Sequence, residues 1–546
     1  MRLRPSIPRT IGTFFYRPPC SCLFRRSICL NIISQPSRPQ LSFLPIFTRQ
    51  PTTRLISTET KEWLKHEIKV GFRYSAIITA TGFLLLVMAT GIQEEYRAHK
   101  YPTPDEWNWN TRLETRAAKA REDSDDPWIK NWMMIGSSYK RVIGKLHDPS
   151  REGQRIVEQS ESNSNLPFDI EGKIGYDVSQ NSEPWRRGYY EVLTGLVRVA
   201  EQLDGYVRDK ALDKFIAWPA SSVTGPSNPK PRPLPVNMPP PPAEDDCVKA
   251  FESPEVYYKL ILTTKGFTEK QRVDSATAYG SWLEYKGKPE LAEKMFKWAV
   301  NIASSSQDTS SSIVDASTYV IKANQCLPSE NILSSTTALA IHYATNSRVD
   351  LALPIFISIL RARKSLPKPS PTMLSTIDAN DKDTNPLWKE ALVFINKCFT
   401  PPKYPPPPSD GSQPPNQDSK GYCEMAGTML NIGEILYSLN QSKSNLEDGL
   451  AWTREAVDIA EAELQKDGGD DDTKNTCKLC LEAGLENWMI MVKQLAEKER
   501  RCEESKPQGL FNFGNFSQPG PGRWEREEEV VKDRITRTSS LLSPSN

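Results

Sequence analysis

One run of residues in this chain can fold in only one way. Residues 74–92, YSAIITATGFLLLVMATGI, are uncharged and mostly apolar, and charged side chains at Arg73, Glu94 and Glu95 bound them sharply. A helix of this length just crosses the hydrocarbon core of a bilayer, where a single segment satisfies its backbone only as a helix. The sequence therefore predicts a transmembrane helix at 74–92. A buried core helix is the alternative, and the charged boundaries count against it.

The residues before this span have the composition of a targeting segment. The first 58 residues hold nine arginines, no lysine and no acidic residue, and they are rich in serine. This composition is typical of a mitochondrial transit peptide, so we expect a presequence at 1–57. The RLIS sequence at 54–57 resembles a processing site and places cleavage near Ile56. A basic arm that binds nucleic acid or anionic lipid is the alternative.

The charges around the span predict its orientation. Residues 58–73 form a short segment that is richer in basic side chains than the other flank, with Lys61, Lys65, Lys69 and Arg73 against Arg97 and Lys100. The positive-inside rule then places the N-terminus in the matrix and everything beyond residue 93 in the intermembrane space. The predicted location is the mitochondrial inner membrane, with a single pass.

A helical hairpin is predicted in GSWLEYKGKPELAEKMFKWAVNIA, residues 280–303. Apolar and small residues recur at helical spacing on both sides of a glycine turn. They match signature positions of the tetratricopeptide repeat, a helix–turn–helix unit of about 34 residues: Gly280, Leu283, Gly287, Ala292, Phe296 and Ala299. An antiparallel helix pair of any other family can share this spacing by chance.

Two further segments repeat the pattern less completely. In the first, Ile359 stands where alanine is usual and no glycine marks the turn, while the matching residues are Ala340, Tyr343, Ala352 and Phe356. In the second, Gly433, Leu436, Gly449 and Ala456 fit only if the turn carries about four extra residues. Several stacked units are needed to bury the apolar faces of such hairpins. We therefore predict an all-α fold, a degenerate tetratricopeptide-repeat solenoid at 183–505 behind a single transmembrane helix.

The other regions are predicted from composition. Residues 93–182 should form membrane-proximal helices and a loop, in which Trp107, Trp109, Trp128 and Trp132 lie at the bilayer interface or fill a small helical core. A helix is expected from Glu183 to about Ile216. Proline-rich insertions at 219–245 and 400–421 should be extended spacers, since proline lacks an amide donor; a polyproline ligand is the alternative. Residues 506–546 have the composition of a disordered tail, in which REEEVVKDRI at 526–535 is the one stretch that could form a short helix.

No motif in the chain indicates catalysis. The only histidines, His66, His99, His147 and His342, have no metal-ligand spacing, and Walker A, GxGxxG and GxSxG motifs are absent from the sequence. The acidic run at 467–472 lacks the ligand order of an EF-hand. Cys477 and Cys480, in CKLC, are interpreted as buried small residues or as a structural disulfide, with redox catalysis the weakest option. We expect no enzyme activity, no cofactor and no metal.

Three short motifs carry a family resemblance. YPTPDEW at 101–107, SEPWRRGYYEVL at 182–193 and AEQLDGYVRDK at 200–210 accompany the presequence, the span and the repeats. Over about residues 60–500 the chain resembles the repeat-containing adaptor subunit of the fungal mitochondrial i-AAA protease. The resemblance implies a non-catalytic protein that binds unfolded or misfolded proteins in the intermembrane space and passes them to the protease. The partners it implies are the i-AAA protease, a co-adaptor, unfolded clients and inner-membrane lipid, and no nucleic acid.

Stacked hairpins turn their first helices toward a concave groove, where a peptide can bind. The side chains expected to face it are Asp274, Thr277, Ser281, Glu284 and Tyr285 in the first clear repeat, and Glu434 and Tyr437 in the last. Ordinary solvent exposure is the alternative for all of them. The alternative function is a repeat receptor or assembly factor for mitochondrial import or respiratory-chain biogenesis.

Overall fold

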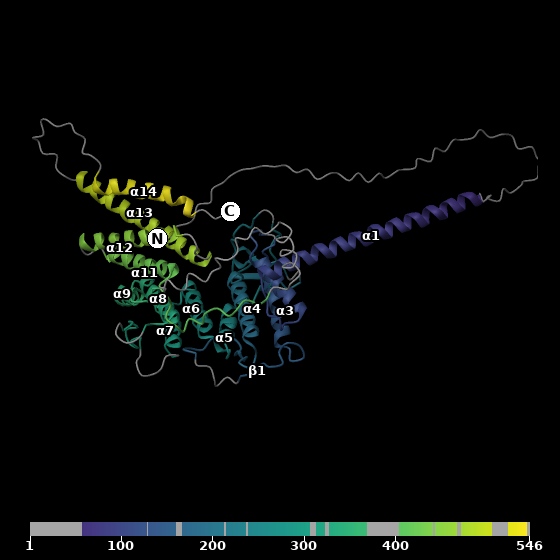
Figure 1. Cartoon of the computed structure of the whole chain (residues 1–546), viewed down its shortest axis with the longest axis horizontal. Helices are drawn as coiled ribbons and strands as arrows, with labels where there is room; N and C mark the ends of the chain where they lie inside the picture. Colours follow the sequence, from purple (N-terminus) through teal and green to yellow (C-terminus); the bar gives the residue numbers. More distant parts are fainter. Residues whose placement is uncertain are drawn as a thin grey trace, which may run out of the picture. The chain divides into compact units, whose positions relative to one another are not determined.

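The computed structural model describes residues 57–127, 129–159, 166–211, 215–235, 238–305, 313–322, 327–368, 403–439, 443–466, 471–504 and 522–542. Within these ranges the chain is mostly helical and has little strand, as Figure 1 shows. The all-α class is confirmed at this level. The predicted presequence, up to and including its cleavage point near Ile56, lies outside the described residues, as do Trp128 and most of the acidic run at 467–472.

Helix α1 (Thr58–Lys100) contains the apolar span. In the described part of the chain, it is the one helix long and apolar enough to cross a membrane, and none of its apolar window is buried. The chain divides into two compact units within this helix, between Phe83 and Leu84. In the second unit Ala98 is buried, at 3% exposure. By its length and composition, this helix is consistent with one crossing of a membrane.

Helices α2 (Trp109–Glu122), α3 (Trp132–His147) and α4 (Glu183–Gln202) follow, and α3 packs against both of the others. The tight contact between α3 and α4 needs Gly195, where a Cβ atom would lie 2.7 Å from the ring of Tyr139. Trp107 is buried in this core and Trp132 packs against it, whereas Trp109 is 68% exposed. The small-core interpretation therefore holds for two of the four tryptophans but not for Trp109.

The helix predicted from Glu183 to about Ile216 is shorter than expected. Helix α4 ends at Gln202, and Gly205 with φ +77° turns the chain into strand β3 (Tyr206–Asp209). Strand β3 pairs antiparallel with β4 (Trp218–Pro219) and β5 (Cys247–Lys249). The first proline-rich insertion links β4 to β5 and contains two short 3-10 turns, η2 (Ala220–Ser222) and η3 (Glu244–Asp246). A second pair, β1 (Val157–Glu158) and β2 (Tyr176–Asp177), lies before α4.

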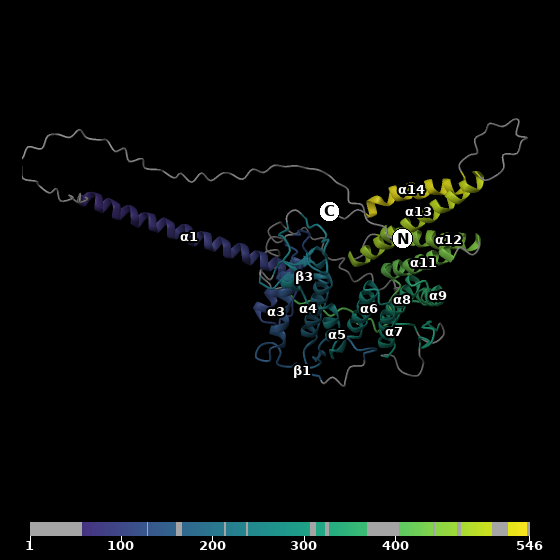
Figure 2. The same ribbon diagram turned by 180° about the vertical axis from the view of Figure 1, so that it is seen from behind.

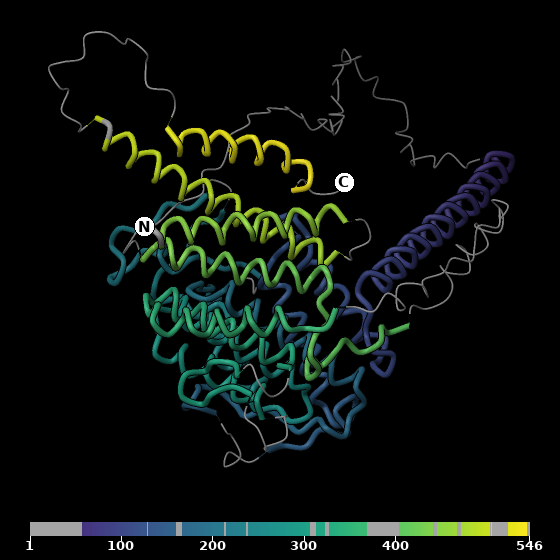
Figure 3. Tube along the Cα trace, turned by 60° about the vertical axis from the view of Figure 1, so that its left-hand side comes forward, coloured from purple at the N-terminus to yellow at the C-terminus, as the bar shows by residue number. Residues whose placement is uncertain are grey.

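The rest of the chain is a succession of helices. They are α5 (Pro254–Thr263), α6 (Glu269–Tyr285), α7 (Pro289–Ser305), α8 (Glu330–Thr345), α9 (Val349–Lys364), α11 (Ser419–Leu439), α12 (Lys443–Leu464), α13 (Asp471–Glu504) and α14 (Arg523–Leu542). Each packs against the next in this order, and α6, α8, α11 and α13 also contact one another in turn. Figures 2 and 3 show α11 to α14 as successive layers.

The first two hairpins have the same construction, offset by 60 residues in the sequence. The α6–α7 turn has Gly287 at φ +71°, and the α8–α9 turn has Ser347 at φ +61°. Ala292 and Ala352 are both fully buried. At Gly280 a Cβ atom would lie 2.8 Å from the ring of Phe296, so glycine lets α6 and α7 approach closely. The left-handed turn that glycine marks in the first hairpin is therefore made by serine in the second.

The short helix allowed at 526–535 is present but longer, and the prediction of a disordered tail is wrong for the rest of residues 523–542. They form α14, which packs against α13 and buries Val531 completely. Its Arg534 contacts Glu461 and Asp458 of α12, each at 2.6 Å. The helix forms because its few apolar residues share one face, and the charged residues that made the segment look disordered lie around that face.

Candidate functional site

The residues predicted on α6 lie along one face of the helix. Asp274, Thr277, Ser281, Glu284 and Tyr285 follow one another at spacings that bring helical side chains together. Asp274, Ser281 and Tyr285 are exposed, the last at 79%, while Thr277 and Glu284 are half-buried. The helix starts in a capping box, in which the Thr268 side chain accepts a hydrogen bond from the Gln271 amide. We call the face the polar face of α6.

Glu284 has a structural partner. Its carboxylate contacts Nδ1 of His342, a side chain that is 2% exposed on α8. It also accepts a hydrogen bond of 3.4 Å from the Asn346 side-chain amide. A buried imidazole needs such a partner. Glu284 therefore joins α6 to α8, and it is less available to a ligand than the prediction assumed.

Helix α8 continues the polar face, and the prediction missed it. Moving 60 residues from Asp274, Thr277 and Ser281 gives Ser334, Thr337 and Ile341, of which Ser334 and Ile341 are exposed. At the start of both helices Lys270 Nζ lies 3.1 Å from Glu330 Oε1. The 60-residue offset between the two hairpins was the sequence signal that would have found these positions.

On α11, Glu434 is exposed and Tyr437 is half-buried. Both line a cavity of about 340 Å³ formed by α11, α12 and α13, whose other walls include Leu446, Ile490, Met491, Gln494 and Lys498. The Tyr437 hydroxyl donates a hydrogen bond of 2.9 Å to the Met491 carbonyl, and burial raises the pKa of that hydroxyl. The Tyr437 ring is therefore a fixed wall of the cavity, while Glu434 is available at its edge.

An extended segment of the chain lies across the N-terminal parts of α4, α6 and α8. Residues 403–418, which we call the strap, are the described part of the second proline-rich insertion. At its start, Arg187 of α4 donates Nη2 to the Pro405 carbonyl at 2.6 Å and Nη1 to the Pro406 carbonyl at 2.9 Å. The ring of Tyr404 lies over the guanidinium, 4.2 Å from its carbon. The predicted spacer is therefore bound to the helices.

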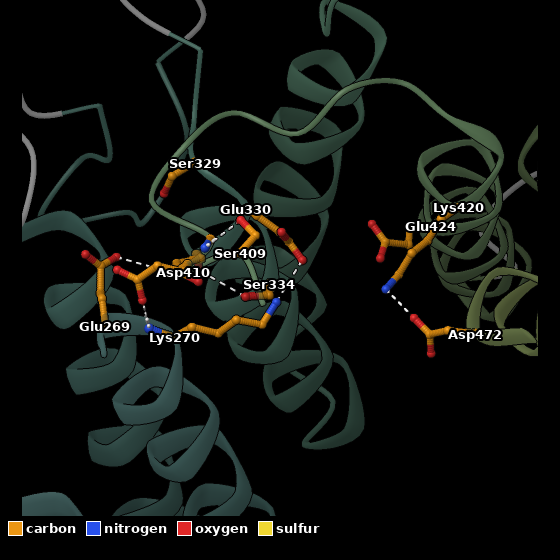
Figure 4. A network of polar contacts seen from close by, with 12 residues as sticks. Glu269, Lys270, Ser329, Glu330, Ser334, Ser409, Asp410, Lys420, Glu424 and Asp472 are labelled. Atoms are coloured by element: carbon orange, nitrogen blue, oxygen red, sulfur yellow. Dashed lines mark hydrogen bonds and ion pairs between the residues drawn. The ribbon is translucent and has the colours of Figure 1, made fainter. Parts of the chain in front are cut away.

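Further along, the strap meets the N-termini of α6 and α8, as Figure 4 shows around Asp410. The Lys270 amide donates to Asp410 Oδ1 at 3.3 Å, the Asn331 amide to the Gly411 carbonyl at 3.1 Å, and the Glu330 amide to the Gln413 carbonyl at 3.2 Å. First-turn amides have no partner inside their own helix, and the helix dipole favours negative groups there. The strap therefore provides acceptors for amides that would otherwise need water.

At Gly411 the backbone of the strap passes very close to the Asn331 side chain of α8. Gly411 has φ +68°, and a Cβ atom there would collide with the side chain of Asn331. The Asn331 side-chain amide donates to the Asp410 carbonyl at 2.9 Å and also to Glu269 Oε1 at 2.9 Å. Beyond it, the Gln417 amide donates to the Pro367 carbonyl at 2.9 Å. Most of the strap's bonds use main-chain atoms, so the surface recognises an extended backbone more than particular side chains.

Cys480 is a buried thiol, as the first interpretation expected, whereas the alternative of a disulfide between Cys477 and Cys480 is wrong. Cys477 is bonded to Cys423, and their Cα atoms are 5.1 Å apart. The bond joins the start of α11 to the start of α13, and Cys480 remains a buried thiol whose pKa burial raises to about 12. Two cysteines three residues apart on one helix both point to the neighbouring helix, so Cys477 reaches a partner there. Nothing in the cysteine spacing indicated Cys423.

In the described part of the chain, no group of three or more histidine, cysteine, aspartate or glutamate side chains could hold a metal. The arrangement offers binding groups: exposed polar side chains on successive helices, helix N-termini and a buried arginine. No family model, no curated protein and no solved structure matches this chain significantly.

Proposed function

We propose that this protein is a membrane-anchored, non-catalytic repeat adaptor that binds unfolded or misfolded proteins in the mitochondrial intermembrane space and delivers them to the i-AAA protease. The resemblance of the motifs at 101–107, 182–193 and 200–210 suggests the protease and the compartment. The helical architecture and the single apolar helix agree with such a protein.

One observation carries the binding part of the proposal. The chain's own strap lies in an extended conformation across α4, α6 and α8, held mainly through its carbonyl groups. An unfolded client offers the same groups at every residue, whatever its sequence. The polar face of α6 continues from the strap toward the C-terminal end of the helix through exposed Ser281 and Tyr285. The matching face of α8 does so through exposed Ser334 and Ile341. An extended client would lie along these faces.

The two matched hairpins support a repeat solenoid. Equivalent glycine or alanine positions, equivalent left-handed turns and equivalent phenylalanines recur after 60 residues. The contacts of α6 with α8, α8 with α11 and α11 with α13 support the same proposal, because a repeat protein builds a continuous surface from neighbouring first helices.

Affinity purification tests the assignment. The tagged full-length protein is purified from mitochondria in mild detergent, and the retained proteins are identified by mass spectrometry. We expect the i-AAA protease at near-stoichiometric levels. Recovery of import translocase or respiratory-complex subunits without the protease would contradict the proposal and favour a receptor or assembly factor.

A matched pair of variants tests the binding face. Asp274→Arg places a bulky cation on the polar face of α6, and Asp350→Arg makes the same change at an exposed position of α9, a second helix of its hairpin. We expect the first variant to stabilise an unfolded reporter protein in the intermembrane space several-fold, and the second to leave its turnover unchanged. Equal turnover in both variants would remove the polar face from the proposal.

A further inference from the structure

Arg187 is an unusual residue for the core of this protein. Its side chain is about 10% exposed, and a buried guanidinium is unfavourable unless its donors are paired. Two of its nitrogens bond strap carbonyls, while Nε has no hydrogen-bond acceptor among the described residues, although Glu183 Oε1 lies 3.4 Å away. The strap is therefore the main partner of a buried charge.

The strap itself is held unevenly. From Pro405 to Asp410 every side chain is exposed, whereas Gly411 and Gln417 are buried. Tyr404 covers Arg187, but its hydroxyl is a buried group without a hydrogen-bond partner among the described residues. The first half, residues 403–410, thus depends on Arg187, the Tyr404 ring and two hydrogen bonds that Asp410 accepts, from the Lys270 amide and the Asn331 side chain. The second half, residues 411–418, is anchored and continues directly into α11.

We propose that Arg187, together with the N-terminus of α6, is a binding site for an extended segment of another polypeptide, and that residues 403–410 are an internal ligand which this segment displaces. The inference deepens the proposed function by naming the ligand class. The preferred ligand is an extended stretch in which an aromatic residue precedes two prolines and an acidic residue lies about four positions after the second proline. KYPPPPSD in the strap has this order.

The chemistry of the contacts explains this preference. Proline holds the backbone extended and has no amide donor, so consecutive carbonyls stay available for the two nitrogens of a guanidinium. An aromatic ring before them stacks on the same guanidinium, as Tyr404 does on Arg187. A carboxylate at the position of Asp410 meets the positive end of α6.

Exchange is favoured because the first half of the strap buries few of its side chains. It accepts the Arg187 hydrogen bonds through its own main-chain carbonyls, which an incoming chain also supplies, and the anchored second half keeps the released segment attached. A tethered ligand has a high effective concentration, so a free peptide competes poorly until the tethered copy is weakened. This sets the design of the test.

The test is binding of a fluorescein-labelled peptide KYPPPPSD to the full-length protein in detergent, followed by anisotropy. Tyr404→Ala removes the ring that holds the internal copy, and we expect the peptide to bind at least tenfold more tightly than to the natural protein. Pro408→Ala is the control within the strap, since this residue is exposed and Arg187 bonds the carbonyls of Pro405 and Pro406, and it should leave the affinity unchanged.

Two variants at the receptor position complete the test. Arg187→Lys in the Tyr404→Ala background keeps the charge and loses the two-pronged donor, so the gained binding should fall at least tenfold. Thermal unfolding of each variant shows whether the fold is retained. If Tyr404→Ala binds the peptide no more tightly than Pro408→Ala, or if Arg187→Lys keeps the gain, the strap is a fixed structural element and the inference is wrong.

The peptide-binding test and the affinity purification can fail independently of each other. Peptide exchange without recovery of the i-AAA protease would keep the Arg187 site and remove the adaptor assignment. Recovery of the protease without peptide exchange would do the opposite.

Discussion

At the scale of single residues, His147 has an environment that makes stability depend on pH. Its Nε2 lies 2.8 Å from the Tyr189 hydroxyl, and its ring centroid is 4.5 Å from that of Tyr176. Burial lowers the pKa of His147 to about 4. The unfolded chain binds a proton near pH 6.5 and the folded chain does not, so stability falls as the pH drops from 6.5 toward 4.

His147→Gln should remove this dependence. In the natural protein, the histidine is expected to lower the free energy of unfolding by roughly 2 kcal/mol as the pH falls from 6.5 to 5. Glutamine has no proton to gain, so this change should be absent from the variant. The measurement is the Tm of the full-length protein in detergent at pH 7 and pH 5, for which the variant should show the smaller difference. His66→Gln, at an exposed histidine, should behave like the natural protein. An unchanged pH difference in His147→Gln would contradict the assignment.

The Cys423–Cys477 bond predicts a second residue-scale effect. It closes a loop with a sequence separation of 54, and loss of such a bond lowers stability by about 2 to 4 kcal/mol. Cys423→Ser and Cys477→Ser should each lower the Tm, while Cys480→Ser should keep the bond. Alkylation under non-reducing conditions followed by mass spectrometry reports the bond directly. A modified Cys423 thiol in the natural protein would show that the bond does not form in the cell.

Among the residues predicted to bind a ligand, local pattern accounts for the exposure of some but not for the contacts of others. Ser281 and Tyr285 face solvent because they lie opposite the buried residues of α6, a property of helical periodicity. Glu284 has the same periodicity, but His342 lies 58 residues away and takes it as a partner. No local pattern predicts that contact.

At the scale of elements, the crossing of α11 and α12 depends on two glycines in contact. A Cβ atom on Gly433 would lie 2.8 Å from the Gly449 carbonyl oxygen, and one on Gly449 would lie 2.7 Å from the Gly433 carbonyl oxygen. Both obstacles are backbone atoms, which cannot move aside as a flexible side chain can. The repeat match at Gly433 and Gly449, which needed extra residues in the turn, therefore marks a close approach of α11 and α12.

Gly433→Ala should separate these helices. The gain of about 1 kcal/mol from alanine in a helix is outweighed by overpacking of about 1 to 3 kcal/mol, and the Tm should fall. Gly427→Ala is the matched control on the same helix, since a Cβ atom there meets nothing within 4 Å, and this change should leave the Tm equal or higher. If both variants had the same Tm, the close approach would not be a constraint.

At the scale of the whole molecule, α14 closes the end of the helical succession. It covers α13, and Glu527 accepts hydrogen bonds from Arg454 and from the Trp488 indole. Trp488 and Val492, on α13, are buried. Terminal units of repeat proteins have a polar outer face that shields such residues. In the proposed repeat architecture, the charged side of α14 would be this outer face.

Deletion of residues 505–546 should therefore act locally. Amide hydrogen exchange in α12 and α13 is expected to accelerate at least tenfold, with little change in α3 and α4, because stacked helices are coupled mainly to their neighbours. Deletion of residues 543–546 alone keeps α14 and should change nothing. Uniform acceleration over all helices would show that the chain unfolds as one cooperative unit.

The sequence by itself determined the features that depend on local pattern. An apolar run of sufficient length must be helical, periodic apolar residues produce helices, and small residues at fixed spacing mark where helices approach. Tertiary structure decided the rest: the pairing of Cys477 with Cys423, the packing of α14, and the binding of a proline-rich strap by Arg187. These depend on contacts between residues far apart in the chain, whose free energy exists only once the helices have brought the partners together.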